Sequence, residues 1–520
     1  MDYRELSVRG SMLARKTTKR AMGWIAACLC ALPTTVIAQQ VAINSGYPLP
    51  AGSGPSGITA GPDGALWFTA GNSIGRITTA GDITTYPVPS STNGLVGITA
   101  GPDNALWFTV ATSKIGRIST TGTITEYPIP TANSGPTGIT LGADQALWFT
   151  ESEANQIGRI TPAGVITEYP VPTPNSGLSG INRPGGITAG PDGALWFTEY
   201  LAGQIGRITT AGVITEYPAP GGPNTGLGPE CITAGPDGAL WFTDMNPSLG
   251  SVSIIGRITT AGVVTQYPLP TADSGPVGIT TGPDGALWFA DYSANIGRVT
   301  TAGVITQYPL PNPQPFSLNQ ITTGPDGELW FTDDYKERIG ELFFVTATLT
   351  ASPSSGVYQS AITFSGSGFA PNEKVRVYSK GVGSAVLAHG MTDSTGSFTA
   401  SATVPHAFYG PQLFVGVGQT SGKLGAATFS ISPLLVLNPT SGPVGTTVTA
   451  EGYGFGSTEH VKLIWPNPFT RLGEQGTRGS GTFGGSGFTF TVPAGSPSGV
   501  TKVEAAGPIQ DKTAAQFTVE

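Results

Sequence analysis

Gly190-Pro191-Asp192-Gly193-Ala194-Leu195-Trp196-Phe197-Thr198 is the stretch of sequence that decides the fold. The phrase occurs seven times with small changes, at intervals of 40 to 48 residues. Its tryptophans are Trp67, Trp107, Trp148, Trp196, Trp241, Trp288 and Trp330. An interval of this length is typical of one blade of a β-propeller, in which each repeat forms a four-stranded sheet. The repeats therefore predict seven blades.

Each copy contains four short apolar segments separated by turn residues. A Gly-Ile-Thr segment leads to the Gly-Pro-Asp-Gly turn, and Trp-Phe-Thr, Ile-Gly-Arg-Ile-Thr and Ile-Thr-Glu-Tyr-Pro follow. Asp-Gly and Ala-Gly junctions suit hairpins, so four antiparallel strands are expected. The last copy lacks a fourth strand of its own, and residues 41–47 resemble the missing one. We therefore expect a propeller over residues 39–346, closed by its N-terminal strand.

Composition supports an all-β protein. The 520 residues include 75 Gly and 44 Pro, and only 11% are charged. This content excludes a coiled coil or a largely helical enzyme. Without residues 1–38 the chain has 19 basic and 31 acidic residues. Because nucleic-acid binding needs a basic face, nucleic acid is excluded as a partner.

The N-terminus has the pattern of an export signal. Four basic residues between positions 15 and 20 precede an apolar run that ends at Val36-Ile37-Ala38. This predicts a signal peptide over residues 1–38, no transmembrane anchor, and secretion or a periplasmic location. A lipoprotein processed at Cys28 is the alternative. Only Cys231 then remains, so no internal disulfide is expected and Cys231 is interpreted as a small buried residue.

The length variation of the repeats is confined to one face of the expected propeller. Both short turns of a blade fall on one face, and the loops after Trp-Phe-Thr and after Tyr-Pro-x-Pro fall on the other. Insertions gathered on one face typically mark a binding face. Polar or unusual residues interrupt the repeat there at Arg183, Tyr200, Glu230, Tyr292, Asn319, Gln320, Asp334, Tyr335 and Lys336.

The blade text Gly-Ile-Thr-x-Gly-Pro-Asp-Gly-Ala-Leu-Trp-Phe-Thr-Glu resembles the virginiamycin B lyase (streptogramin lyase) family over about 300 residues. The resemblance implies a magnesium-dependent lyase that linearises cyclic depsipeptide antibiotics by elimination. It also implies a histidine base just ahead of an innermost strand, in a Pro-His-Gly-Ile context. The corresponding positions here are Ser56, Val96, Thr137, Gly185, Glu230, Val277 and Asn319. None is histidine, and the three histidines, His389, His406 and His460, follow the propeller.

Carboxylates are the remaining candidates for chemistry. The position after Trp-Phe-Thr or Trp-Phe-Ala is occupied by Ala70, Val110, Glu151, Glu199, Asp244, Asp291 and Asp333. We expect these repeated acids to accept bonds from the N–H groups of the following loops. Glu230 is the candidate base, and Asp333 and Asp334 are the candidate metal ligands, with magnesium implied only by the resemblance. The repeated Asp residues are assigned to the turns, and the arginines to contacts between blades. These arginines are Arg76, Arg117, Arg159, Arg207, Arg257 and Arg298.

The C-terminal third contains a second repeat. Residues 352–369 correspond to residues 438–455 at an offset of 86 residues, and each copy continues into alternating strands. Two units of this size predict immunoglobulin-like β-sandwiches over residues 347–432 and 433–520. Their Gly-x-Gly-Phe text resembles the IPT/TIG-like domains of bacterial exported proteins.

Three functions follow from these patterns. The favoured one is an exported binding or scaffold propeller whose variable-loop face holds a peptide, glycan or protein, with the sandwiches as spacers. The first alternative is a carbon–oxygen lyase of the virginiamycin B type that uses Glu230 or Asp334 with a divalent ion. The second is a metal-dependent hydrolase of lactones or esters, which rests on fold analogy.

Overall fold

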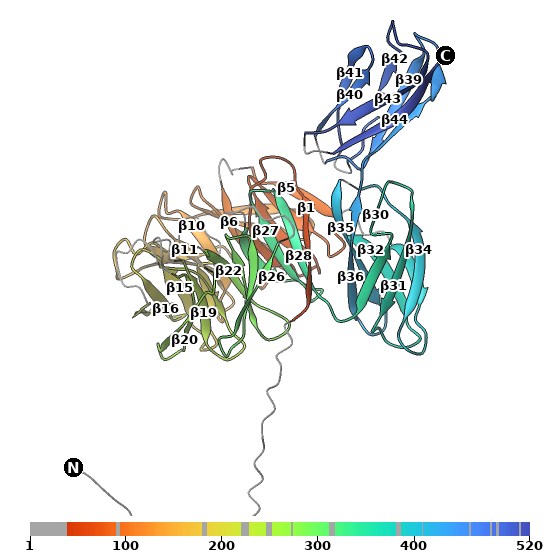
Figure 1. Ribbon diagram of the computed structural model, residues 1–520. Coiled ribbons are helices and arrows are strands. Elements are labelled where there is room, and N and C mark those ends of the chain that lie inside the picture. The colour runs from red at the N-terminus through yellow and green to blue at the C-terminus, as the bar shows by residue number, and fades with distance from the viewer. Residues whose placement is uncertain are drawn as a thin grey trace, which may run out of the picture. The chain divides into compact units, whose positions relative to one another are not determined.

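The computed structural model describes most of the chain beyond residue 38. The described residues are 39–89, 94–178, 185–219, 228–245, 252–271, 274–310, 318–380, 386–407, 409–456, 459–478, 481–484, 488–508 and 511–520. They form β-strands and no α-helix (Figure 1), as the composition predicts. No described helix is long and apolar enough to cross a membrane. The predicted signal peptide, and with it the alternative at Cys28, lies outside the described residues.

Six four-stranded sheets are each built from four consecutive strands. Blade 1 comprises β2 (Pro55–Ala60), β3 (Leu66–Ala70), β4 (Ser73–Ile77) and β5 (Ile83–Pro87). Blade 2 comprises β6 (Leu95–Ala100), β7 (Ala105–Val110), β8 (Lys114–Ser119) and β9 (Ile124–Pro128). Blade 3 comprises β10 (Pro136–Leu141), β11 (Leu147–Glu151), β12 (Gln156–Ile160) and β13 (Ile166–Pro170). Blade 4 comprises β14 (Ile187–Ala189), β15 (Leu195–Glu199), β16 (Gln204–Ile208) and β17 (Ile214–Pro218). Blade 5 comprises β18 (Pro229–Ala234), β19 (Leu240–Asp244), β20 (Ile254–Ile258) and β21 (Val264–Pro268). Blade 6 comprises β22 (Pro276–Thr281), β23 (Leu287–Asp291), β24 (Asn295–Val299) and β25 (Ile305–Pro309).

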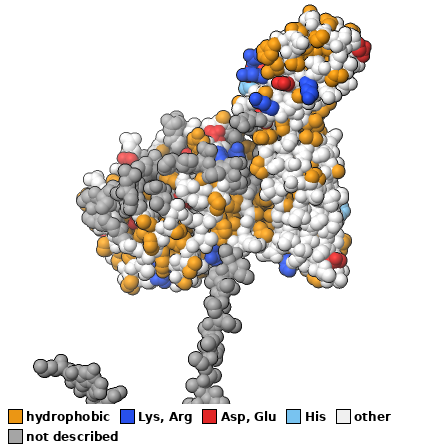
Figure 2. All heavy atoms as spheres, in the orientation of Figure 1, with side chains coloured by type: hydrophobic (Ala, Val, Ile, Leu, Met, Phe, Trp, Pro, Cys, Tyr) orange, Lys and Arg blue, Asp and Glu red, His pale blue; other side chains and the backbone are white. Residues whose placement is uncertain are grey.

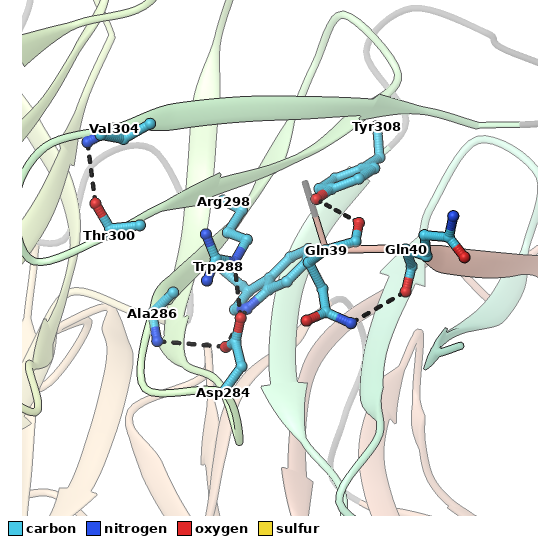
Figure 3. Close-up of polar contacts among 9 residues, drawn as sticks. All are labelled: Gln39, Gln40, Asp284, Ala286, Trp288, Arg298, Thr300, Val304 and Tyr308. Atoms are coloured by element: carbon cyan, nitrogen blue, oxygen red, sulfur yellow. Dashed lines mark hydrogen bonds and ion pairs between the residues drawn. The ribbon is translucent and has the colours of Figure 1, made fainter. Parts of the chain in front are cut away.

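Blade 7 joins the two ends of the propeller sequence. It contains β26 (Leu318–Thr323), β27 (Leu329–Asp333), β28 (Arg338–Phe344) and β1 (Val41–Pro48), and β1 runs antiparallel to β28 at the outer edge. The buried Tyr47 hydroxyl donates a 2.6 Å hydrogen bond to Glu341 across this pair. Figure 3 shows a further link, in which the Tyr308 hydroxyl of blade 6 donates to the Gln39 carbonyl at 2.9 Å. The predicted closure by the N-terminal strand is therefore confirmed.

The first strands of the blades form a ring. β2, β6, β10, β14, β18, β22 and β26 each contact the next, and β26 contacts β2. Because the strands alternate in direction, the β2–β3 and β4–β5 turns and their equivalents share one face, named here the turn face. The β3–β4 loops, the links between blades and their equivalents share the other, named here the variable face. This matches the predicted division of the loops.

The Asp of each turn organises its own blade. In blade 6, Asp284 accepts hydrogen bonds from Trp288 Nε1 at 2.9 Å and Arg298 Nε at 2.7 Å (Figure 3). The backbone N–H of Ala286 also donates to Asp284, at 3.3 Å, which fixes the turn. The predicted role of the aspartates in the turns is thus confirmed. The prediction that the arginines bridge blades is wrong, because the sheet register places Arg298 directly opposite Trp288 within one blade.

The C-terminal strands form two sandwiches of the same topology. The first pairs a sheet of β29 (Thr348–Ser352), β31 (Ala361–Ser367) and β34 (Phe398–Thr403) with one of β30 (Ser355–Gly356), β36 (Leu424–Ile431), β35 (Gly410–Gly418), β32 (Lys374–Lys380) and β33 (Val386–Met391). The second pairs a sheet of β37 (Leu434–Asn438), β39 (Thr447–Tyr453) and β42 (Thr489–Thr491) with one of β38 (Ser441–Gly442), β44 (Lys512–Val519), β43 (Gly499–Ala506), β40 (His460–Pro466) and β41 (Phe469–Gly476). Each has its own apolar core, the first around Phe364 and Phe414 and the second around Trp465 and Phe517. The domain limits and the IPT/TIG resemblance stay predictions.

Candidate functional site

A network of threonine hydroxyls fixes the inner strands at the variable face. In blades 1, 2, 4, 5 and 7 the Thr of the Trp-Phe-Thr segment donates to the carbonyl of the position where the family pattern places histidine in the next blade. Thr198 Oγ1 donates to the Glu230 carbonyl at 2.9 Å, and Thr243 Oγ1 to the Val277 carbonyl at 2.7 Å. Blade 6 has Ala290 in place of this threonine, so it supplies no such hydroxyl to blade 7. The backbone at these positions is thus held in place around the mouth of the ring.

Glu230 stands beside a second acid at this mouth. Glu230 lies in β18 and Asp244 ends β19, and their side chains are 2% and 6% exposed. Burial, and then the charge of Glu230, raises the pKa of Asp244 to about 7. A carboxyl that titrates near neutrality can exchange protons with a bound ligand. The sequence predicts Glu230 as the candidate base, and the structure adds Asp244, which sequence reasoning had grouped with the repeated loop acids.

The side chains of Cys231 and Gln320 lie between the inner strands of blades 4 to 7. A Cβ atom added to Gly185 of blade 4 would lie 2.7 Å from Cys231 Sγ and 3.3 Å from Gln320 Nε2. A Cβ added to Gly278 of blade 6 would lie 2.3 Å from Gln320 Oε1. Gln320 therefore extends from blade 7 past blade 6 to blade 4. Its Oε1 atom is buried and accepts no hydrogen bond within the described part of the chain. Cys231 is 1% exposed, in agreement with its predicted role as a small buried residue.

Other predicted face residues lie on the variable-face loops. Tyr200 is 8% exposed, and its N–H donates to the Gly177 carbonyl. Tyr292 N–H donates to the Gly275 carbonyl in the equivalent place of blade 6. Asn319 Nδ2 donates to the Pro55 carbonyl at 3.4 Å, which connects blade 7 to blade 1. Arg183 lies outside the described residues.

The loop after β27 contains the four remaining candidates. Asp333 is buried and accepts a hydrogen bond from the Lys336 N–H at 3.0 Å, while Tyr335 is 71% exposed. Burial, followed by the charge of Glu337, raises the pKa of Asp334. Asp333 also interacts with the charge of Arg338. The Asp333 carboxylate is therefore already balanced by protein groups.

These donors do not fit the magnesium that the family resemblance implies. In the described residues, no three His, Cys, Asp or Glu side chains come together as a metal site. Glu230 and Asp244 supply two carboxylates without a third ligand of these types, and cationic side chains surround Asp333. A metal at Asp333 and Asp334 stays a prediction.

The repeated acids that follow Trp-Phe-Thr or Trp-Phe-Ala fall into two groups, which differ in whether the carboxylate is bonded to the following loop. Asp291 accepts the N–H of Ser293 at 2.9 Å, and Asp333 accepts that of Lys336, so the predicted loop role is confirmed in blades 6 and 7. Glu151 and Glu199 are fully buried, and in the described part of the chain their carboxyl oxygens accept no hydrogen bond from a loop N–H group. Burial raises the pKa of each to about 8. For these two residues the prediction is wrong, because the longer glutamate side chain turns into the blade instead of toward the loop.

The described surface of the propeller has few charged side chains in the view of Figure 2. This agrees with the low charged fraction of the sequence.

Comparison with known proteins points to one family. The model of the virginiamycin B lyase family matches residues 37–183 and 177–352. A solved streptogramin B lyase is 36% identical, covers 58% of this chain and 97% of its own length, and superposes with a TM-score of 0.53. The virginiamycin B lyase of Staphylococcus aureus is 37% identical over 59% of this chain and all of its own, with a TM-score of 0.53. A catalytically inactive His-to-Ala variant of that enzyme, solved with quinupristin, matches equally well. None of the curated proteins matches the chain.

Proposed function

The chain belongs to the virginiamycin B lyase family, and from this premise we propose that it is an exported binding propeller that holds a peptide-like ligand at the mouth of its ring without lyase turnover. The single observation that carries this proposal is the composition of the seven inner-strand positions. They are occupied by Ser56, Val96, Thr137, Gly185, Glu230, Val277 and Asn319, and none is histidine.

Loss of the histidines separates binding from catalysis. An elimination needs a base that can take a proton next to a carbonyl group at neutral pH, and imidazole is the usual side chain for this task. A His-to-Ala variant of the S. aureus relative is catalytically inactive and was nevertheless solved with quinupristin. A propeller of this family without such a histidine is therefore compatible with ligand binding.

The mouth of the ring offers suitable contacts for a cyclic depsipeptide. In this proposal the carboxylates of Glu230 and Asp244 accept N–H groups of the ligand, and the Gln320 amide lies among the inner strands of blades 4 to 7. Tyr292 lies on an adjoining loop and is partly exposed, whereas Tyr200 is almost fully buried. Pockets that combine aromatic walls with a few fixed polar groups are typical of small-ligand sites. The sandwiches are proposed to act as spacers.

Calorimetric titration with quinupristin tests the binding proposal. We expect saturable binding, and we expect Glu230→Gln to weaken it about tenfold or more, because a buried acceptor for ligand N–H groups is altered. Asp82→Asn is the matched control, since Asp82 pairs with Thr78 in a turn on the opposite face and should not affect binding. Absence of binding, or equal binding by Glu230→Gln, would contradict the proposed site.

One observation favours a second function, a lyase with a carboxylate base. The pKa of Asp244 is raised to about 7, which is suited to general base catalysis at neutral pH. Such an enzyme would open the depsipeptide ring to a linear product of unchanged mass. The hydrolase alternative would give a product heavier by one water, so chromatography with mass detection distinguishes the two.

A further inference from the structure

Blades 2 and 6 each pair an acid with a donor side chain, although the acid and the donor occupy different positions in the two blades. In blade 2, Lys114 Nζ lies 3.2 Å from the Glu126 carboxylate. In blade 6, Gln307 Nε2 donates to Asp291 at 3.1 Å and to Ser274 Oγ at 3.3 Å. A buried carboxylate requires such a partner because removing its hydration shell is costly.

Blade 3 has the arrangement of blade 6, but it lacks the donor side chain. The equivalents of Asp291, Gln307 and Ser274 are Glu151, Glu168 and Ser134, so a second carboxylate replaces the amide. Sheet register places Gln156 directly opposite Glu151, and Glu168 directly opposite Gly158. A Cβ on Gly158 would lie 2.8 Å from Glu151 Oε1, so the Glu151 carboxyl extends over this glycine toward Glu168.

Four oxygen atoms in this cluster make no hydrogen bond of normal length and angle among the described residues, although Ser134 and Glu168 lie close enough to Glu151 to interact with its carboxyl. They are Ser134 Oγ, Glu151 Oε1, Glu151 Oε2 and Gln156 Oε1, and Ser134 and Glu151 are fully buried. Burial raises the pKa of Glu151, and the Glu168 charge adds to the rise while Ser134 opposes it, so both neighbours lie within reach of the carboxyl. The Thr131 N–H satisfies one oxygen of Glu168 at 3.0 Å. No described Lys or Arg contributes to the pKa of Glu151.

We propose that blade 3 binds a divalent cation of the calcium type between Glu151 and Glu168, with Gln156 Oε1 and Ser134 Oγ as further ligands. Carboxylate, amide and hydroxyl oxygens are the donors that Ca²⁺ accepts, and two glutamates neutralise its charge. Mg²⁺ fits less well, because it demands near-ideal octahedral geometry and retains several waters. This site is separate from Glu230 and Asp244, and it does not depend on the proposed ligand binding.

Blade 4 has a similar pair of acids, but the neighbouring oxygen atoms are already bonded to other side chains. Glu199 also has two oxygens there that make no hydrogen bond of normal length and angle among the described residues, and its neighbour is Glu216. The two other equivalent groups are already bonded, because Ser176 Oγ donates to Asn155 Oδ1 at 2.9 Å and Gln204 Oε1 accepts a bond from Thr173 Oγ1 at 3.3 Å. Blade 4 therefore lacks the four-oxygen set.

Thermal denaturation of the full chain with CaCl₂, MgCl₂ or EDTA at pH 8 tests the site. We expect 10 mM Ca²⁺ to raise Tm by about 2 °C or more over EDTA, and Mg²⁺ to have a smaller effect. Glu168→Gln copies the acid–amide pair of blade 6, so it should fold, lose the calcium response and have a higher Tm in EDTA.

The reciprocal substitution provides a matched control. Gln307→Glu gives blade 6 two carboxylates beside Ser274 and should lower Tm in EDTA, but it should add no second calcium-dependent rise, because Asp291 Oδ1 already accepts bonds from Gly275 and Ser293. Calcium titration calorimetry of the same proteins counts the ions bound per chain. A wild-type protein that does not respond to Ca²⁺, or a response that survives in Glu168→Gln, would overturn the proposal.

Discussion

At the scale of single residues, small changes within the repeat determine the chemistry of each blade. Gln307 beside Asp291 gives a closed hydrogen-bond network, whereas Glu168 beside Glu151 gives two acids that face each other. Sequence alone identifies the substitution but not its effect, because only the register and the depth of burial show that the two carboxyls meet. Likewise, Glu230 could be selected from the sequence, whereas its pairing with Asp244 required the structure.

The two buried glutamates predict how stability depends on pH at this scale. Burial raises the pKa of Glu151 and Glu199 to about 8, so the folded state binds more protons than the unfolded state between their ordinary pKa near 4.5 and about 8. The free energy of unfolding in EDTA should therefore fall as pH rises through this window and level off above it.

Variants and denaturant titrations check this dependence. The double variant Glu151→Gln/Glu199→Gln should flatten the pH profile and be more stable than the wild type at pH 8, because each pKa unit corresponds to about 1.4 kcal/mol. Glu126→Gln is the control, since Glu126 already pairs with Lys114. A wild-type profile that is flat between pH 5 and 8 would contradict the burial argument.

At the scale of elements, the closing strand β1 joins the two ends of the ring by pairing with β28. The seven Trp-containing repeats were sufficient to predict the blades and this closure, because turn chemistry and strand period are local properties of sequence. The contact partners of the repeated arginine side chains could not be predicted in the same way. Whether Arg298 meets its own blade or the next depends on sheet register, which places it opposite Trp288.

Tyr47→Phe tests the contribution of this strand. It removes the 2.6 Å hydrogen bond to Glu341 in a buried setting, so the free energy of unfolding should fall by about 1.5–3 kcal/mol. Tyr169→Phe is the matched control, because Tyr169 stacks on Trp148 in the equivalent way but its hydroxyl makes no hydrogen bond within the described part of the chain. Equal effects of the two substitutions in denaturant titrations would show that the closure bond contributes nothing specific.

At the scale of the whole molecule, the fold and family are clearer than the activity. The propeller covers the region that matches the virginiamycin B lyase family, while the inner-strand positions lack every histidine that the family pattern leads one to expect. Fold follows from the many repeated positions, whereas function depends on a few positions that the repeat does not constrain. The variable-face residues could therefore be located by broken repeats, but their ligand could not be identified from them.

The most direct test of the central claim is incubation of the protein with quinupristin and Mg²⁺, followed by liquid chromatography with mass detection. The S. aureus virginiamycin B lyase serves as the active reference. We expect quinupristin to stay cyclic at a protein concentration high enough to bind it. A linear product of unchanged mass, formed at a rate proportional to protein concentration, would contradict the account and establish a lyase that works without a propeller histidine.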